Sequence, residues 1–177
     1  QYDKVVETAR ELVDSGEMKS VEGKDTLKPE EAIKYDNDVF LFLVDSCSRL
    51  ASQNPAMHTE AIKAFNDYAA KYTSTDLKDA PQADKMYYAA IDQHMKRAAA
   101  AADDKSADED KKLALKYCDH ICQNWPKSDL YPTAELLAAG ILLNHTDNAV
   151  KATAMPRLEK AADAGVALNS KAGRATT

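Results

Sequence analysis

The residues best suited to chemistry lie in one short stretch. Residues 114–129, "ALKYCDHICQNWPKSD", contain Cys118, His120, Cys122 and the chain's only tryptophan. This Cys-x-His-x-Cys spacing could indicate a small metal or redox site, or ordinary packing within a helix. At about 100° per residue, Cys118 and Cys122 share one face of a helix, whereas His120 lies about 200° from Cys118. The three side chains therefore do not converge, and we predict that both cysteines are packing residues.

Other signatures of catalysis or cofactor binding are absent from the sequence. No glycine-rich phosphate loop and no G-x-S-x-G motif occurs, and no histidine has a partner at a metal-binding spacing such as H-E-x-x-H. The four histidines are scattered along the chain, at His58, His94, His120 and His145. We predict no catalytic residue, no metal, no cofactor and no enzymatic activity. An enzyme or a redox contact that uses Cys118 or Cys122 is the weaker alternative.

The composition favours helix and excludes two classes of partner. The chain has 177 residues, of which only five are glycine and six are proline, while alanine, the best helix former, is abundant. Its net charge of -6 is unsuited to nucleic acid or anionic lipid, both of which require a basic surface. The longest apolar run, residues 39–44, is far shorter than the roughly 20 residues of a membrane span.

Hydrophobic periodicity predicts an all-α protein of about seven helices. The expected helices cover 2–15, 30–53 (as one helix or two), 54–72, 80–101, 106–125, 132–144 and the region from about 156. Asn54-Pro55 and the capping box Ser106-x-x-Glu109 are predicted helix starts. We expect one helical domain over 1–177, with N-terminal helices in 1–54, a hairpin in 55–102, a second hairpin in 103–145, and a C-terminal helix with a polar tail in 146–177.

The two predicted hairpins are similar in sequence. Residues 61–76 align with 114–129, and residues 80–90 align with 131–141 after a slip of two residues. The first alignment pairs Ala61 with Ala114, Phe65 with Cys118, Tyr68 with Ile121 and Tyr72 with Trp125. These positions form the i, i+4, i+7, i+11 stripe of an amphipathic helix. The sequence therefore predicts two copies of a unit made of a helix, a turn with proline and a second helix.

These two stretches resemble tetratricopeptide repeats, particularly the bacterial envelope branch that includes outer-membrane assembly lipoproteins and cell-division coordinator proteins. The resemblance covers about 56–165 and is carried by Ala61-x3-Phe65-x2-Tyr68-x3-Tyr72 and by Ala114 through Trp125-Pro126-x-Ser128. It implies a right-handed α-solenoid of stacked antiparallel hairpins, whose first helices line a concave groove. The spacing from Ala61 to Ala114, 114 minus 61 or 53 residues, also fits an irregular bundle with repeat-like hairpins.

The resemblance further implies a partner protein or peptide in that groove. The groove candidates are the polar-side positions of the two first helices, and they could equally be an ordinary solvated face: Lys63, Asn66, Asp67, Ala70, Lys116, Asp119, His120 and Gln123. We expect a non-catalytic interaction module. The alternative function is a helical bundle that binds an apolar small molecule in an interior pocket, indicated by residues 39–44 and by several tyrosines. The sequence does not indicate an oligomeric state.

The location of the protein is indicated only weakly. The polar beginning "QYDKVV" suits the mature form of an exported protein whose signal peptide has been removed, so we expect a bacterial periplasmic or otherwise exported protein. Three cysteines cannot form a complete disulfide framework, and they do not identify the compartment.

Overall fold

The chain folds into α-helices stacked along one direction. A computed structural model describes residues 4, 6–8, 10–11, 29–72 and 82–175. Within these residues there are seven numbered helices and no strand, so the all-α prediction is confirmed. The helices are α2 (Pro29–Leu50), α3 (Ala56–Lys71), α5 (Ala83–Ala100), α6 (Asp104–Asn124), α7 (Tyr131–Leu143), α8 (Asn148–Ala152) and α9 (Met155–Ala175).

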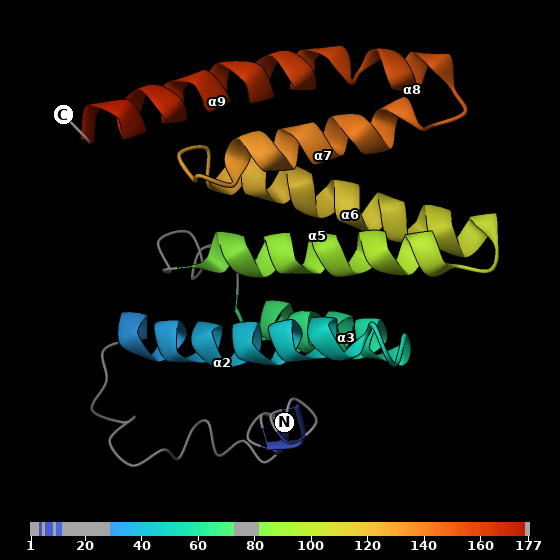
Figure 1. Cartoon of the computed structure of the whole chain (residues 1–177), viewed down its shortest axis with the longest axis vertical. Helices are drawn as coiled ribbons and strands as arrows, with labels where there is room; N and C mark the ends of the chain where they lie inside the picture. The colour runs from blue at the N-terminus through green and yellow to red at the C-terminus, as the bar shows by residue number, and fades with distance from the viewer. Residues whose placement is uncertain (1–3, 5, 9, 12–28, 73–81, 176–177) are drawn as a thin grey trace.

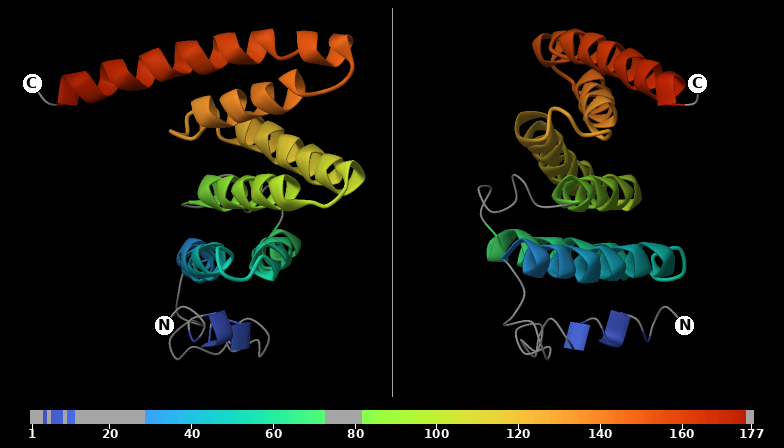
Figure 2. Two further views of the ribbon diagram at one scale, coloured as in Figure 1. Left: turned by 45° about the vertical axis from the view of Figure 1, so that its right-hand side comes forward. Right: turned by 90° about the vertical axis from the view of Figure 1, so that its left-hand side faces the viewer.

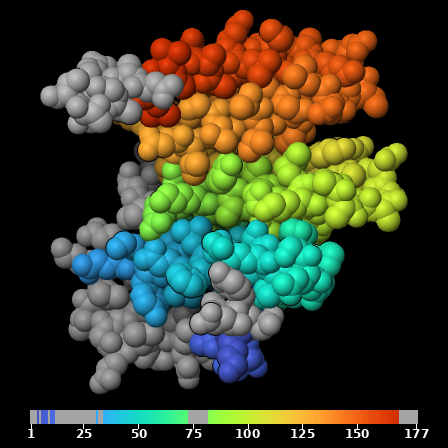
Figure 3. All heavy atoms as spheres, in the orientation of Figure 1, coloured from blue at the N-terminus to red at the C-terminus, as the bar shows by residue number. Residues whose placement is uncertain are grey.

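Each helix packs mainly against its neighbours in the chain. Helix α3 contacts α2 and α5, α6 contacts α5 and α7, and α7 contacts α9. Figure 1 shows α2 and α3 near one end of the long axis and α9 at the other, and the turned views of Figure 2 show the same order. In the space-filling view of Figure 3, the helices form successive bands. The middle of the stack, α3 to α6, is therefore where helices from both predicted hairpins meet.

Two predicted helix starts can be compared with the structure. The side-chain oxygen of Asn54 accepts a hydrogen bond from the backbone N–H of Ala56 at 3.2 Å, but α3 begins at Ala56 with Pro55 at the cap position, one residue later than predicted. The capping box at Ser106 is wrong, because α6 begins earlier. Asp103 has an extended backbone, and its carboxylate accepts the N–H of Ser106 at 2.9 Å. Asp103 is thus the cap, and Ser106 lies within the first turn.

Other predicted boundaries have mixed outcomes. One long helix, α2, covers most of 30–53 in place of two short ones, and it ends at Leu50, three residues before the predicted end. The short helix α8 was not predicted; it begins where the carboxylate of Asp147 accepts the N–H of Ala149 at 2.7 Å. Most of the helix predicted over 2–15, and the proline predicted to open α5 at Pro81, lie outside the described residues.

The aligned positions of the two hairpins occupy matching places in the core. In α3 and α6 the paired positions are buried alike, at Ala61 and Ala114, Phe65 and Cys118, and Tyr68 and Ile121. Tyr72 and Trp125, the fourth pair, are both partly buried against the same core. The second helices also match, because Ala83 of α5 and Ala134 of α7 are both fully buried. The predicted hydrophobic stripe is therefore confirmed in both first helices.

Aromatic rings fill the space between α3, α5 and α6. The ring of Phe65 lies edge-on to Tyr87, with centroids 5.0 Å apart, and to Tyr117, at 4.9 Å. Such pairs stabilise beyond the area that they bury. The hairpin of α3 and α5 is thereby joined to the first helix of the next hairpin.

The apolar segment 39–44 is covered on one side only. Phe40, Leu43 and Val44 are buried in the core, but the side chain of Phe42 is 67% exposed. Neighbouring helices therefore do not enclose this segment on every side. Helices α3 and α5 both contact α2, and neither covers Phe42.

Candidate functional site

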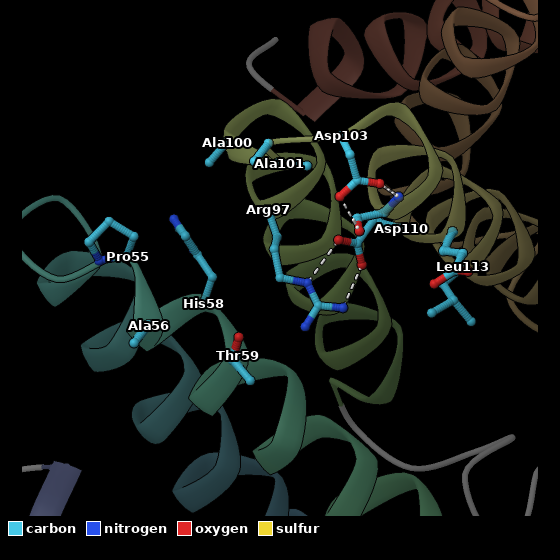
Figure 4. Close-up of a pocket in the computed structure, with 13 residues that line it drawn as sticks. Pro55, Ala56, His58, Thr59, Arg97, Ala100, Ala101, Asp103, Asp110 and Leu113 are labelled. Carbon is cyan, nitrogen blue, oxygen red and sulfur yellow. Dashed lines mark hydrogen bonds and ion pairs between the residues drawn. The ribbon is translucent and has the colours of Figure 1, made fainter.

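A hollow of about 590 Å³ lies where α3 and α6 begin and α5 ends, and it is shown in Figure 4. We call it the end hollow. Its wall combines small apolar side chains with several charged ones: Pro55, Ala56, His58, Thr59, Arg97, Ala100, Ala101, Ala102, Asp103, Ser106, Glu109, Asp110 and Leu113. Two hydrogen bonds of the helix cap join Asp103 and Ser106 in this wall.

A second hollow of about 380 Å³ adjoins the first. We call it the middle hollow. It is lined by Thr59, Ile62, Lys63, Asn66, His94, Arg97, Leu113 and Tyr117. Thr59, Arg97 and Leu113 line both hollows, which therefore form one depression between α3, α5 and α6. We call this depression the α3–α6 groove.

Arg97 stands at the junction of the two hollows. Its Nε donates to Asp110 Oδ2 at 2.8 Å, and its Nη2 donates to Asp110 Oδ1 at 2.6 Å. Figure 4 shows both bonds as dashed lines, with the third nitrogen on the side of α3 and Thr59. A bidentate pair of this kind fixes the plane of the guanidinium group. Arg97 is nevertheless 36% exposed, whereas the carboxylate of Asp110 is buried.

His94 completes this buried cluster. It is 1% exposed, and its Nδ1 lies 2.7 Å from Asp110 Oδ1. Burial lowers the pKa of His94, which therefore stays neutral at pH 7. Burial alone would raise the pKa of Asp110, but the hydrogen bonds from Arg97 and His94 hold it below its usual range. Asp110 is thus an ionised acceptor, and Nδ1 of His94 carries the proton. Nε2 of His94 is left as a buried acceptor with no hydrogen-bond partner among the described residues.

A third hollow, of about 330 Å³, lies between α6, α7 and the start of α9. We call it the C-terminal hollow; it is lined by Asp119, Cys122, Gln123, Tyr131, Glu135, Thr153, Pro156, Arg157 and Lys160. Arg157 Nη1 donates to Glu135 Oε2 at 2.9 Å, and Nη2 donates to Asp119. The hydroxyl of Tyr131 also donates to Glu135, at 3.2 Å. This arginine therefore ties α9 to both α6 and α7.

The structure divides the predicted groove residues between two places. Lys63 and Asn66 line the middle hollow, whereas Asp119 and Gln123 line the C-terminal hollow. The other exposed candidates lie outside the lining of all three hollows; they are Asp67, Ala70 and Lys116. The candidates therefore do not line a single hollow, although both pairs lie where one helix of the stack meets later ones.

His120 differs from its predicted position on a polar face. Its ring is stacked on Tyr87, with centroids 4.2 Å apart, and lies edge-on to Trp125 at 5.5 Å. Its Nε2 is buried and has no hydrogen-bond partner in the part of the chain that the structure describes. The reason is that α5 packs over this side of α6, and the flat imidazole ring packs well against the aromatic rings there.

The cysteines are placed for packing. Cys118 is fully buried, as predicted, and Cys122 is partly buried. Burial raises the pKa of both thiols to about 12. No group of three or more His, Cys, Asp or Glu side chains in the described part of the chain is arranged to hold a metal ion.

Sequence reasoning did not single out Arg97 or Asp110 as site residues, and it treated His94 only as an isolated histidine. His94 and Arg97 are three residues apart on α5 and so share a face. This spacing could have been used to predict that they lie close together. Asp110 belongs to the next helix, and its contact with them depends on how α5 and α6 cross. Only tertiary structure brings the three together.

Two further findings concern membrane-spanning helices and similarity to known proteins. Within the described ranges, each helix is either too short or too polar to span a lipid bilayer. Comparison with known protein families, with curated proteins and with solved structures finds no match to this chain.

Proposed function

We propose that the protein is a non-catalytic interaction module that binds a segment of a partner protein in the α3–α6 groove. The observation that carries this proposal is the pair of adjoining hollows, of about 590 and 380 Å³, with a fixed guanidinium group between them. Together they offer a partner more length than either hollow alone.

The lining of the groove suits a peptide segment. Apolar side chains such as Pro55, Ile62 and Leu113 can cover a partner's apolar residues. Arg97 and Lys63 offer donors, and Glu109 offers an acceptor. Protein interfaces combine an apolar centre with polar groups in this way.

The repeated burial pattern supports a tetratricopeptide-like arrangement of the hairpins. Asn66 and Asp119 occupy equivalent positions in the alignment, and each lines a hollow beside a helix that follows later in the chain. In a stack of such units, equivalent positions on successive first helices recur along one binding surface. The same resemblance supports a bacterial envelope location, which osmotic-shock fractionation of the source cell would test.

The state of the thiols supports a non-catalytic role. A thiolate is the reactive form of cysteine, and a pKa of about 12 leaves little thiolate at pH 7. We expect Cys118 and Cys122 to react with iodoacetamide far more slowly in the folded protein than in urea. Rapid labelling of either thiol in the folded protein would instead favour the enzyme or redox alternative.

The alternative of an interior site for an apolar molecule gains less support. Of the residues that suggested it, Phe40, Leu43 and Val44 are packed in the core. The ring of Tyr68 packs edge-on against Phe40, and the ring of Tyr87 packs edge-on against Phe65. These side chains fill the core and do not enclose an interior site.

Capture of the partner tests the proposed function. The full chain, tagged and expressed in the source cell, is cross-linked and purified, and the purified protein is also examined by native mass spectrometry. One recurring protein neighbour is the expected result. A stoichiometric small molecule without a protein neighbour would contradict the proposal and favour the apolar-ligand alternative.

A further inference from the structure

The middle hollow offers hydrogen-bond donors without a carboxylate of its own. We propose that it binds the carboxylate of an aspartate or glutamate side chain of the bound segment, with Arg97 and Lys63 as donors. This inference rests on the proposed function, because it specifies the chemistry of the segment that the groove takes. Its first support is the state of the arginine.

Arg97 is already oriented for a second acceptor. Two of its nitrogens, Nε and Nη2, are bonded to Asp110, while Nη1 makes no hydrogen bond to any described residue. Figure 4 places this free nitrogen on the side of α3, away from Asp110. An arginine that is held in one geometry loses little side-chain freedom when it binds a further acceptor. Arg97 can therefore act as an anchor without first being ordered.

The rest of the middle hollow is compatible with a negative charge. None of its eight lining residues is acidic. In addition to Arg97, four of them have side chains that can donate a hydrogen bond, namely Thr59, Lys63, Asn66 and Tyr117. Lys63 is exposed and has no ion-pair partner among the described residues. Because Asp110 offsets much of the charge of Arg97, Lys63 supplies most of the net attraction.

The end hollow has the opposite character. Asp103, Glu109 and Asp110 all line it, so a partner's carboxylate would be repelled there. The contrast makes the middle hollow the favoured place for an acidic side chain, in a chain whose net charge is -6. It also gives the bound segment a direction, with its acidic residue over Arg97 and neutral or basic residues toward Glu109.

His94 and Asp110 act as positioning residues in this arrangement. Asp110 holds the guanidinium plane, and the neutral His94 donates to the same carboxylate oxygen as Arg97 Nη2. Since His94 lacks a charge, it adds no attraction for the ligand. A single bound residue should therefore bind weakly, with a dissociation constant in the range of about 1 to 10 mM.

A pair of minimal ligands tests the inference on the full chain. N-acetyl-glutamate N-methylamide and its glutamine analogue are titrated at constant ionic strength, and the NMR signal of the Arg97 Nε–H group is followed. We expect the glutamate compound to shift this signal and to bind at least five times more tightly than the glutamine compound. Equal binding of the two compounds would overturn the inference.

Two matched variants locate the site. Lys63→Gln removes the proposed positive charge, and Lys116→Gln changes the exposed lysine at the equivalent position of α6, outside the lining of the middle hollow. We expect Lys63→Gln to weaken binding of the glutamate compound at least threefold and Lys116→Gln to leave it unchanged. Equal effects of both variants would show only general surface charge and would contradict the proposal.

Inorganic phosphate, titrated under the same conditions, separates a carboxylate subsite from a general anion site. Weaker binding of phosphate than of the glutamate compound supports the inference, and tighter binding overturns it. Failure of the inference leaves the proposed function standing if a protein partner is still captured by cross-linking. Failure of that capture would remove the proposed function whatever the small compounds do.

Discussion

Two arginines bind buried carboxylates across helix contacts, and they differ in which of their nitrogens donate to carboxylates. Arg97 binds Asp110 through two nitrogens, makes no hydrogen bond through Nη1 to the described residues and is 36% exposed. Arg157 binds Glu135 through one Nη and Asp119 through the other, and it is 22% exposed. Glu135, like Asp110, is buried.

The difference separates a structural contact from the proposed binding surface. Both terminal nitrogens of Arg157 are used to join three helices, so the C-terminal hollow is internally neutralised. Arg97 is fixed by a single carboxylate and still presents one edge to the groove. An arginine paired with a buried carboxylate thus joins helices in both places, and at Arg97 we propose that it also binds a partner.

The largest expected effect comes from removing the arginine of the C-terminal hollow. Arg157→Met leaves Glu135 buried without a cation, and we expect the free energy of unfolding to fall by about 3 to 5 kcal/mol. Urea denaturation measures this loss, and hydrogen exchange should show faster opening of α9. Lys160→Met, on the same helix and exposed, is the control and should change stability little. Equal effects of the two substitutions would contradict the assigned role of Arg157.

A smaller effect is expected at the groove. Arg97→Gln should lower the free energy of unfolding by about 2 kcal/mol, because Asp110 loses charged hydrogen bonds but keeps the one from His94. The positive charge of Arg97 also helps to lower the pKa of His94. An NMR titration should therefore find a higher pKa for His94 in this variant. An unchanged or lower value would show that the two side chains are not coupled as described.

The smallest expected effect is a dependence of stability on pH. Burial lowers the pKa of His94 and of His120 in the folded protein below the ordinary value of 6.5. The unfolded chain then binds protons more readily, so stability should fall as the pH decreases below about 6.5, by at most about 1.4 kcal/mol per pH unit for each histidine. Urea denaturation at pH 7.5 and 5.5 measures the change. In His94→Gln the decrease in stability between pH 7.5 and 5.5 should be smaller. An unchanged decrease would show that His94 does not cause it.

Features that depend on local sequence were predicted well. The all-α class, the single long helix over most of 30–53 and the matching stripes of α3 and α6 follow from periodicity and from residue propensities. The burial of Cys118 followed from its place on the stripe, opposite Phe65 in the alignment. These features could be predicted from the sequence because each depends on residues within one helix.

Features that depend on contacts between helices were missed. His120 was placed on a polar face, but α5 covers that face and brings Tyr87 against the imidazole ring. The cluster of His94, Arg97 and Asp110 needs two helices at one crossing, which no periodicity specifies. The same limit explains why Lys63 and Asp119, predicted for one groove, line separate hollows.

The most direct test of a binding groove between α3 and α6 compares two threonines. Thr59 lines the α3–α6 groove and Thr153 lines the C-terminal hollow; both side chains are exposed. Each is replaced in turn by the photo-cross-linking residue p-benzoylphenylalanine, in the full chain expressed in its source cell. We predict that illumination links a protein partner to position 59 and not to position 153. Linkage from position 153 alone, or equally from both, would contradict the assignment of the groove.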